Sequence, residues 1–219
     1  MNKKILLLSL IFLIVSGVAS AQDNNNSDNV NIIRLNQIHK LLDYRFVGGF
    51  YGFEKLFFQT VSYPEQAQQN CILGIMIASF EVSCNGELSN VSIKNSLGNG
   101  LDKEVSKFLN ATRGHWNPCQ DQRYTRFTIP IQFTLKGTET DSTIAAIVYT
   151  GNDPGYVCYS DSYYLKKAKE ALEKGKGKRA QPFLETLIKR NPYEDSYYNL
   201  LEQAMNAPDN KSKKDKHKK

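Results

Sequence analysis

The stretch GIMIASFEVSCNGELSNVSIK, residues 74–94, decides the fold of this chain. From Met76 to Val82 the more apolar side chains alternate with the others at a period of two, which is typical of a strand with one buried face. Asn85-Gly86 then separates this run from a second one. This pair is common in tight hairpins, because both central residues of a type I′ turn need positive φ. The stretch predicts a β-hairpin.

Two further elements complete a small sheet. Residues 101–109 carry apolar positions at helical spacing, and residues 127–135 alternate at a period of two again. A helix between strands two and three makes a crossover, so strand three can lie beside strand one and antiparallel to it. Pro130 cannot donate to a sheet ladder, so we expect strand three to be an edge strand.

The sequence therefore predicts an α+β fold. We expect a small antiparallel three-stranded sheet of order 2-1-3 with helices on one face, followed by a short α-helical segment. This first domain should span residues 44–136. Residues 137–160 should form a connector, in which residues 144–149 could add a strand.

The first 21 residues have the order of a secretory signal peptide. Lys3 and Lys4 precede an apolar run, and small residues end it at Ala21. Cleavage after Ala21 would export the protein, whereas retention of this segment would anchor it in the inner membrane. In residues 22–43 we expect a flexible Asn-rich leader and then a short amphipathic helix.

The formal charge of +6 is concentrated at the two ends of the chain. Lys3 and Lys4 supply two positive charges, and residues 208–219 supply six lysines against two aspartates, a net of four. The body between them is close to neutral. We therefore expect no nucleic-acid partner, and we expect residues 208–219 to be a basic disordered tail.

A repeated tetrapeptide marks residues 161–207. DSYY at residues 161–164 recurs at residues 195–198, and this spacing of 34 residues is the period of a tetratricopeptide repeat. The segment is similar to that family, which implies helices at residues 162–174 and 178–190 and a third helix to residue 207. A segment with so few repeats rarely buries its own apolar faces. We therefore expect these helices to pack on the first domain or on another protein.

Four cysteines indicate disulfides rather than a metal site. They are Cys71, Cys84, Cys119 and Cys158, and no two of them lie within four residues of each other, as zinc ligands commonly do. The predicted strand order brings Cys84, at the end of strand one, close to Cys119, just before strand three. Cys71 would then pair with Cys158.

No set of catalytic residues is evident in the sequence. It has no Gly-x-Ser-x-Gly elbow, and Gly98-Asn99-Gly100 lacks the lysine of a phosphate-binding loop. We therefore expect a protein that is not an enzyme and that uses no cofactor and no metal.

Several short motifs of this chain occur together in one known family. In chain order they are YP at residues 63–64, Gly74, FEV at 80–82, NGEL at 85–88, GLD at 100–102, WNP at 116–118 and IPIQF at 129–133. In this order and spacing they resemble the TonB C-terminal domain, in the variety common in Bacteroidetes. The resemblance covers residues 48–135.

The resemblance implies a periplasmic domain that binds an extended segment of an outer-membrane receptor. In that family the segment adds to the open edge of the last strand, here residues 123–135, and an unpaired edge needs only an extended peptide. The partner-binding residues expected on this edge are Arg126, Thr128, Gln132 and Thr134. A full energy transducer also has an anchored helix and a long Pro-rich span, whereas this chain has seven prolines.

Two functions follow from this interpretation. The first is a periplasmic adaptor that captures an extended peptide by strand addition in TonB-dependent transport. The alternative is an envelope scaffold that binds partners through the repeat-like helices, with the sheet edge covered. Pairing of residues 144–149 with strand three would block the peptide site and favour the scaffold. An open edge would also allow a strand-swapped homodimer.

Overall fold

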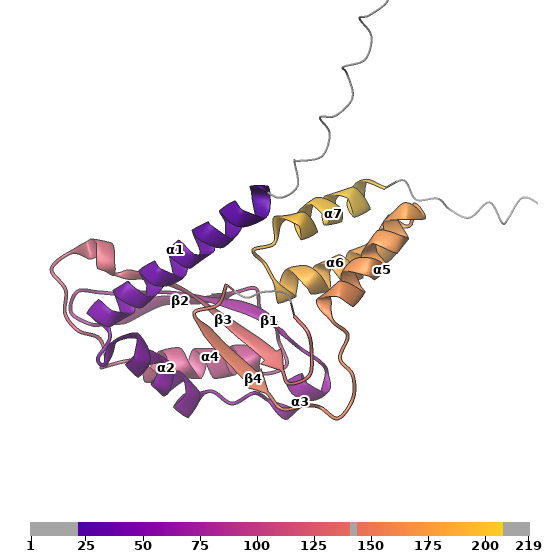
Figure 1. The fold of residues 1–219 in the computed structure, drawn as a ribbon. Coiled ribbons are helices and arrows are strands. Elements are labelled where there is room, and N and C mark those ends of the chain that lie inside the picture. Colours follow the sequence, from indigo (N-terminus) through magenta and orange to yellow (C-terminus); the bar gives the residue numbers. More distant parts are fainter. Residues whose placement is uncertain (1–21, 141–143, 208–219) are drawn as a thin grey trace, which may run out of the picture.

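A computed structural model describes residues 22–140 and 144–207 (Figure 1). The predicted signal peptide, residues 1–21, and the predicted basic tail, residues 208–219, lie outside the described residues. Within the described ranges, no helix is both long and apolar enough to cross a membrane.

The chain folds as an α+β unit followed by three helices. In chain order the elements are α1 (Gln22–Arg45), α2 (Gly49–Thr60), α3 (Glu65–Gln69), β1 (Gly74–Val82), β2 (Leu88–Lys94), α4 (Leu101–Ala111), the 3₁₀ turn η1 (Gln122–Tyr124), β3 (Arg126–Leu135), β4 (Ile147–Gly151), α5 (Asp161–Glu173), α6 (Gly177–Arg190) and α7 (Asp195–Asn206).

The sheet has four strands in the order β2-β1-β3-β4. β1 is antiparallel to β2 and to β3, which agrees with the predicted order 2-1-3. The prediction of a purely antiparallel three-stranded sheet is wrong, because β4 pairs with β3 in parallel. Parallel neighbours need a long connection rather than a tight turn, and residues 136–146 supply one.

Pro130 does not mark an edge strand, which corrects the prediction. Pro130 lies opposite Ile77 of β1, and its carbonyl oxygen accepts a hydrogen bond of 2.8 Å from Ala146 N, on the β4 side. The N–H and C=O of a strand residue point to the same side, so the missing N–H also faces β4. β4 starts at Ile147. Pro130 therefore removes no hydrogen bond between β3 and β1. It lies where the parallel pairing of β3 with β4 begins.

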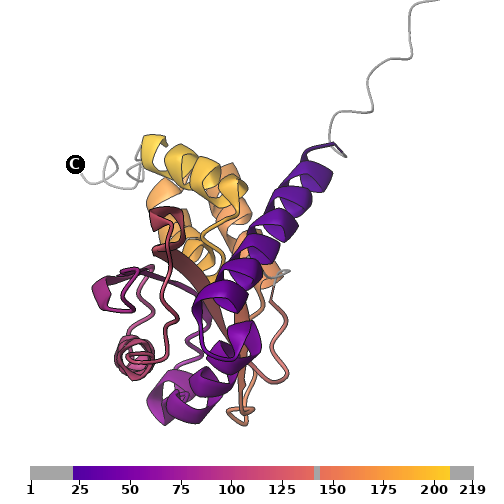
Figure 2. The same cartoon turned by 90° about the vertical axis from the view of Figure 1, so that its left-hand side faces the viewer.

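Helices lie on both faces of the sheet rather than on one. α2 and α4 cover one face, and α1 and the helices α5–α7 lie on the other side (Figures 1 and 2). Met76, Ala78 and Phe80 of β1 are fully buried with Phe53 of α2 and Phe108 of α4. The prediction placed helices on one face only and left the outward face of β1 without a covering helix. In the structure the C-terminal helices supply a cover for part of it.

α1 is longer than the short helix predicted within residues 22–43. It continues back to Gln22, where a flexible leader was expected. Ile38 and Leu42 anchor the helix in the core, and once a helix is nucleated each added residue gains a hydrogen bond at little further cost. The poor helix propensity of the Asn-rich stretch is therefore not decisive.

The C-terminal end of α1 is fixed by one buried cation. Arg45 is fully buried, and its guanidinium donates to the carbonyl oxygens of Asn117 at 3.0 Å and Ser83 at 2.8 Å. It also donates to the carbonyls of Val82, the last residue of β1, and of Tyr124, which precedes β3. These bonds hold α1 across the ends of the two central strands.

The hairpin between β1 and β2 is present, but its turn is not of type I′. Gly86 has φ of 86°, whereas Asn85 is not among the residues with positive φ. The loop has five residues, and Ser83 organises it: its N–H donates to Glu87 O, and its hydroxyl accepts from the N–H groups of Asn85 and Glu87. Extra loop residues therefore replace the tight turn.

Two disulfides connect the four cysteines. They join Cys84 to Cys119 and Cys71 to Cys158, the pairs expected from the strand order. The second bridge ties the segment before α5 to the segment that leads into β1. It thereby holds the C-terminal helices close to the sheet.

The helices α5, α6 and α7 have a small core of their own and rest on the start of β1. Ala168, Ala180 and Leu184 lie in that core. Asn95 donates from Nδ2 to Ile75 O at 2.6 Å and to Lys189 O at 2.8 Å. A side chain at Gly74, whose φ is 148°, would collide with the carbonyl of Lys189. The helices therefore pack within the molecule, one of the two arrangements expected.

Replacing Glu104 of α4 by glutamine is expected to lower stability by about 1 kcal/mol at neutral pH. Glu104 Oε2 accepts from the N–H of Ser62 at 2.8 Å and from its hydroxyl at 2.9 Å. These bonds, the backbone one foremost, lower the pKa of the Glu104 carboxyl. A lowered folded-state pKa gives stability above the unfolded pKa that is lost as pH falls through the folded value.

Urea denaturation of wild type and E104Q at neutral and acidic pH checks this expectation. The difference between the two proteins should be largest near neutral pH and should shrink in acid. A difference that does not change with pH would show that the carboxylate charge contributes nothing at this position.

Candidate functional site

The C-terminal half of the predicted binding edge is covered. β4 pairs with residues 131–135 of β3, so the outward backbone of this stretch is already used. Gln132 is buried, and Thr134 shares a hydrogen bond of 3.1 Å with Thr150 of β4 through their hydroxyls. In this structure neither residue faces a free edge, because β4 occupies that place. Half of the predicted site is therefore not open to a partner.

The N-terminal half of β3 remains open. Arg126 and Thr128 are exposed, and β4 pairs only from Ile131 onward. Thr128 pairs with Ser79 of β1 and lies two residues before Pro130 in β3. Backbone groups two residues apart in a strand point to the same side, so the N–H and C=O of Thr128 also point away from β1. Within residues 22–140 and 144–207, neither of these two backbone groups has a hydrogen-bond partner. This stretch can therefore accept and donate main-chain hydrogen bonds.

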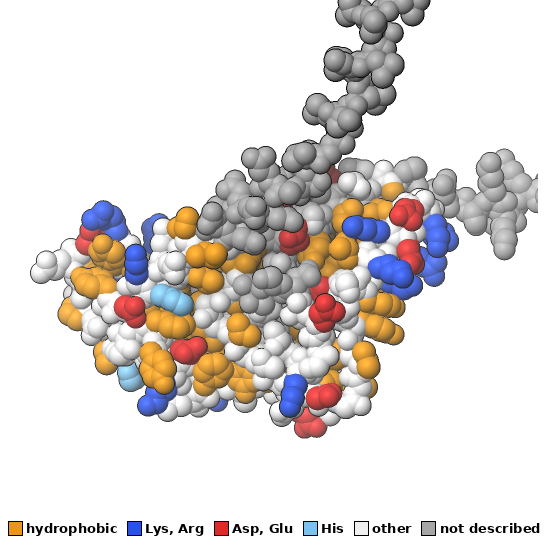
Figure 3. Space-filling view, in the orientation of Figure 1, with side chains coloured by type: hydrophobic (Ala, Val, Ile, Leu, Met, Phe, Trp, Pro, Cys, Tyr) orange, Lys and Arg blue, Asp and Glu red, His pale blue; other side chains and the backbone are white. Residues whose placement is uncertain are grey.

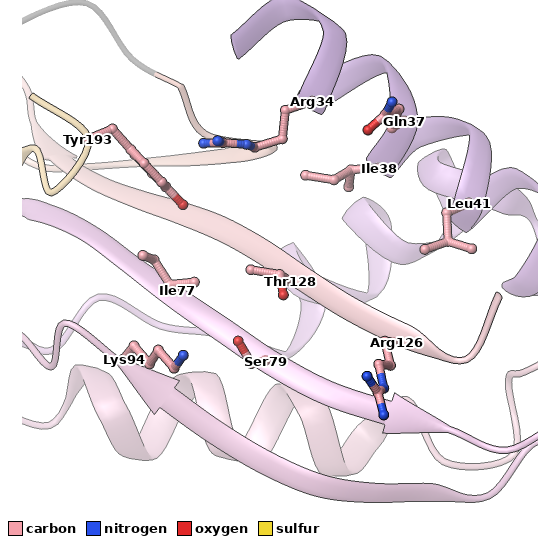
Figure 4. Close-up of a pocket in the computed structure, with 10 residues that line it drawn as sticks. All are labelled: Arg34, Gln37, Ile38, Leu41, Ile77, Ser79, Lys94, Arg126, Thr128 and Tyr193. Atoms are coloured by element: carbon pink, nitrogen blue, oxygen red, sulfur yellow. The ribbon is translucent and has the colours of Figure 1, made fainter. Parts of the chain in front are cut away.

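A groove of about 550 Å³ lies beside the open stretch, over the outward face of the sheet (Figure 4). One wall is α1, which supplies Arg34, Gln37, Ile38 and Leu41. The strands supply Ile77, Ser79, Lys94, Arg126 and Thr128, and Tyr193 from the loop after α6 stands at one end. The groove thus combines an apolar part with hydroxyls and cations.

The charges around the groove are mostly positive. Arg126 Nε lies 3.2 Å from Glu81 Oε1, so this cation has an acidic neighbour. The Arg34 guanidinium lies 5.2 Å from the centre of the Tyr193 ring, a contact that leaves its N–H donors available. Lys94, at the end of β2, is exposed and makes no ion pair among the described residues. The groove therefore offers uncompensated positive charge.

Sequence reasoning named Arg126 and Thr128 but missed the other residues of the groove. Ile77 could have been found, since the alternation of β1 places it on the face opposite Met76 and Phe80. Nothing in the local sequence indicates Tyr193, which reaches the sheet from the far end of the chain (Figure 4). These residues come together only through the packing of distant elements.

Hydrophobic and charged side chains are interspersed over the face in Figure 3, with several basic ones over the end formed by α5 and α6. Among the described residues, no group of three or more His, Cys, Asp or Glu side chains is placed to hold a metal ion.

The central part of the fold, from the end of α2 to the end of β3, is the part that comparison with known proteins identifies. Residues 59–135 match the family model of the Gram-negative bacterial TonB protein C-terminal. No curated protein and no solved structure matches the chain. The TonB C-terminal match ends at Leu135, the last residue of β3. α1, β4 and α5–α7 thus lie wholly outside it, and the groove is built partly from residues beyond the TonB-like region.

The TonB C-terminal match suggests a broad class of function. The family is non-catalytic, which is consistent with a protein that is not an enzyme, and it suggests involvement in TonB-dependent transport with a protein partner such as an outer-membrane receptor. The match and the two disulfides are consistent with the cell envelope. The Bacteroidetes variety and the tetratricopeptide resemblance of residues 161–207 stay predictions.

Proposed function

We propose that this chain is a periplasmic, non-catalytic adaptor that captures an extended segment of a partner protein, such as an outer-membrane receptor, by strand addition. The observation that carries the proposal is the open stretch of β3, where the N–H and C=O of Thr128 face away from β1 without partners. The binding residues of the proposal are Arg126 and Thr128. Gln132 and Thr134 would join them only if β4 moved away.

Hydrogen bonds to the sheet edge alone do not give strong binding of a peptide. Main-chain bonds to an added strand are worth about 1 kcal/mol each, so the few that Arg126 and Thr128 offer would give only weak, millimolar-class binding. The groove beside them can add contacts to the side chains of the bound segment. α1 would then hold the segment against the sheet from above.

Under this proposal, the N-terminal sequence directs export of the protein to the periplasm. Cleavage after Ala21 would release a mobile periplasmic protein, and retention of residues 1–21 would make it an inner-membrane protein instead. Mass spectrometry of the mature chain separates the two cases, since the cleaved form begins at Gln22.

Replacing Thr128 by proline is expected to weaken binding of receptor-segment peptides by at least about tenfold, because it removes the outward N–H and places a ring there. The hydrogen bonds between β1 and β3 should survive, because the backbone of residue 128 points away from β1, as that of Pro130 does two residues later. The probes are synthetic peptides that cover the periplasmic N-terminal segments of outer-membrane receptors from the same genome. Fluorescence anisotropy gives their affinities.

Two control variants make this test specific. Thr128→Val keeps the backbone N–H and a branched side chain, so it should bind nearly as well as wild type. Tyr149→Pro removes an N–H at the outer edge of the sheet, because Ala146 N points to β3 and the backbone sides alternate along β4. Loss of binding in Y149P with normal binding in T128P would move the site to β4 and contradict the proposal.

Two observations favour the scaffold alternative. β4 covers Gln132 and Thr134, as that alternative requires, and the segment before α5 exposes Tyr156, Val157 and Tyr159. Val157 is 87% exposed. Under the scaffold hypothesis, Tyr159→Ser would weaken partner binding and T128P would not.

A further inference from the structure

The charge of the groove indicates which peptides it accepts. We infer that the groove between α1 and the sheet selects extended segments that carry an acidic side chain, bound between Arg34 and Lys94. This inference rests on the proposed function and names the chemistry of its partner. Figure 4 shows Arg34 and Lys94 on opposite sides of the groove, with the Tyr193 ring at its end.

The first argument is the balance of charges along the groove. Among the described residues its lining includes Arg34, Lys94 and Arg126 and no Asp or Glu. The carboxylate of Glu81, beside Arg126, already accepts from Arg126 and, at 2.7 Å, from Asn90 Nδ2. Glu81 lies four residues along β1 from Ile77, which is about 13 Å in a strand. At the end of the groove near Ile77 and Lys94, no Asp or Glu of the described residues is part of the lining.

The second argument is the kind of donor that remains free. Lys94 pairs in register with Ile77, so its ammonium stands beside the apolar floor rather than far out on a loop. The Arg34 guanidinium lies over the Tyr193 ring, and a guanidinium in that position still has N–H groups that can bind a carboxylate. A carboxylate that reaches either cation would gain charge-assisted hydrogen bonds.

The third argument is the shape and polarity of the floor. Ile38, Leu41 and Ile77 give the groove an apolar part, and Ser79 and Thr128 place hydroxyls along the strands. Side chains of an extended segment alternate, so every second one can face this floor. A segment that mixes small apolar side chains with an acidic one fits this lining better than a uniformly charged polymer does.

The chain's own basic end does not suit the groove. Residues 208–219 carry six lysines and two aspartates, so a like charge would meet Arg34 and Lys94. The occupant is therefore a segment of another protein.

The test compares two peptides that differ only in charge. The probes are a fluorescein-labelled peptide of alternating valine and threonine with one central glutamate, and the same peptide with glutamine. At low salt the glutamate peptide should bind the wild type about two- to fivefold more tightly, as expected for one partly exposed charge interaction. Added salt should reduce the difference.

Substitutions assign the effect to the groove. Lys94→Gln should remove the preference for glutamate. Lys55→Gln removes the same charge from an exposed position on α2, which covers the opposite face of the sheet, and should leave the preference intact. Light scattering shows whether a second copy of the chain fills the groove: a dimer that K94Q dissolves would overturn the inference.

The outcomes separate this inference from the proposed function. Equal binding of both peptides by the wild type, weakened in both cases by T128P, would overturn the acidic preference and leave strand addition in place. A glutamate preference that K94Q removes and T128P does not affect would support the groove and contradict strand addition. Failure of both peptides to bind would count against both.

Discussion

Replacing Cys71 and Cys158 together by serine is expected to lower the free energy of unfolding by about 4 to 5 kcal/mol. The bridge joins residues 87 positions apart, so its loss frees a long loop of the unfolded chain. The other bridge joins Cys84 to Cys119 across a separation of 35. On the same chain-entropy basis its loss should cost about 1 kcal/mol less.

Guanidinium denaturation of the two double variants without reductant measures this difference. The C71S/C158S protein should be the less stable of the two. Wild type unfolded in the presence of reductant is the control, and it should be less stable than either variant. The opposite rank of the two variants would show that the loop-length argument does not govern these bridges.

Replacing Arg190 by methionine is expected to cost about 3 to 5 kcal/mol, the usual result of removing one partner from a buried ion pair. Arg190 Nη1 lies 2.7 Å from Asp161 Oδ1, and their side chains are 3% and 4% exposed. The same nitrogen donates to Tyr159 O at 2.9 Å, and the guanidinium lies 4.7 Å from the centre of the Tyr164 ring. The variant removes the Arg190 cation from beside the buried Asp161 carboxylate.

A double-mutant cycle isolates this pair. R190M with Asp161→Asn should be less destabilised than the sum of the two single changes, because the uncompensated charge is gone. Amide hydrogen exchange should place the loss in α5 and α6, which this pair connects. Additive effects, or a loss confined to the sheet, would show that the pair does not couple the helices.

The central part of the fold could be predicted because its signals are local and strong. The alternation of residues 74–82 and 127–135 gives two strands, and the helix between the hairpin and the third strand fixes their order. β4 was harder to predict, because the sequence pattern of a five-residue strand is too short to indicate which strand it pairs with. Pro130 misled the prediction because a proline also fits an inner strand where the neighbouring ladder begins.

The candidate site could be predicted only in part. Arg126 and Thr128 follow from the strand pattern, whereas the loss of Gln132 and Thr134 follows from β4, which the sequence suggested without placing. The groove depends on α1 and on Tyr193, which lie at opposite ends of the chain. No pattern of period two or 3.6 connects residues that meet only by tertiary packing.

The most direct test of the proposed function is the exchange of individual backbone amides with solvent, measured by NMR with and without a bound receptor-segment peptide. Strand addition at β3 predicts that the Thr128 amide, unpaired in the free protein, becomes protected when the peptide binds, while the amides of Ile147 and Tyr149, which face the outer edge of β4, do not change. Binding that leaves the Thr128 amide unprotected and protects amides of α5–α7 instead would contradict strand addition at β3.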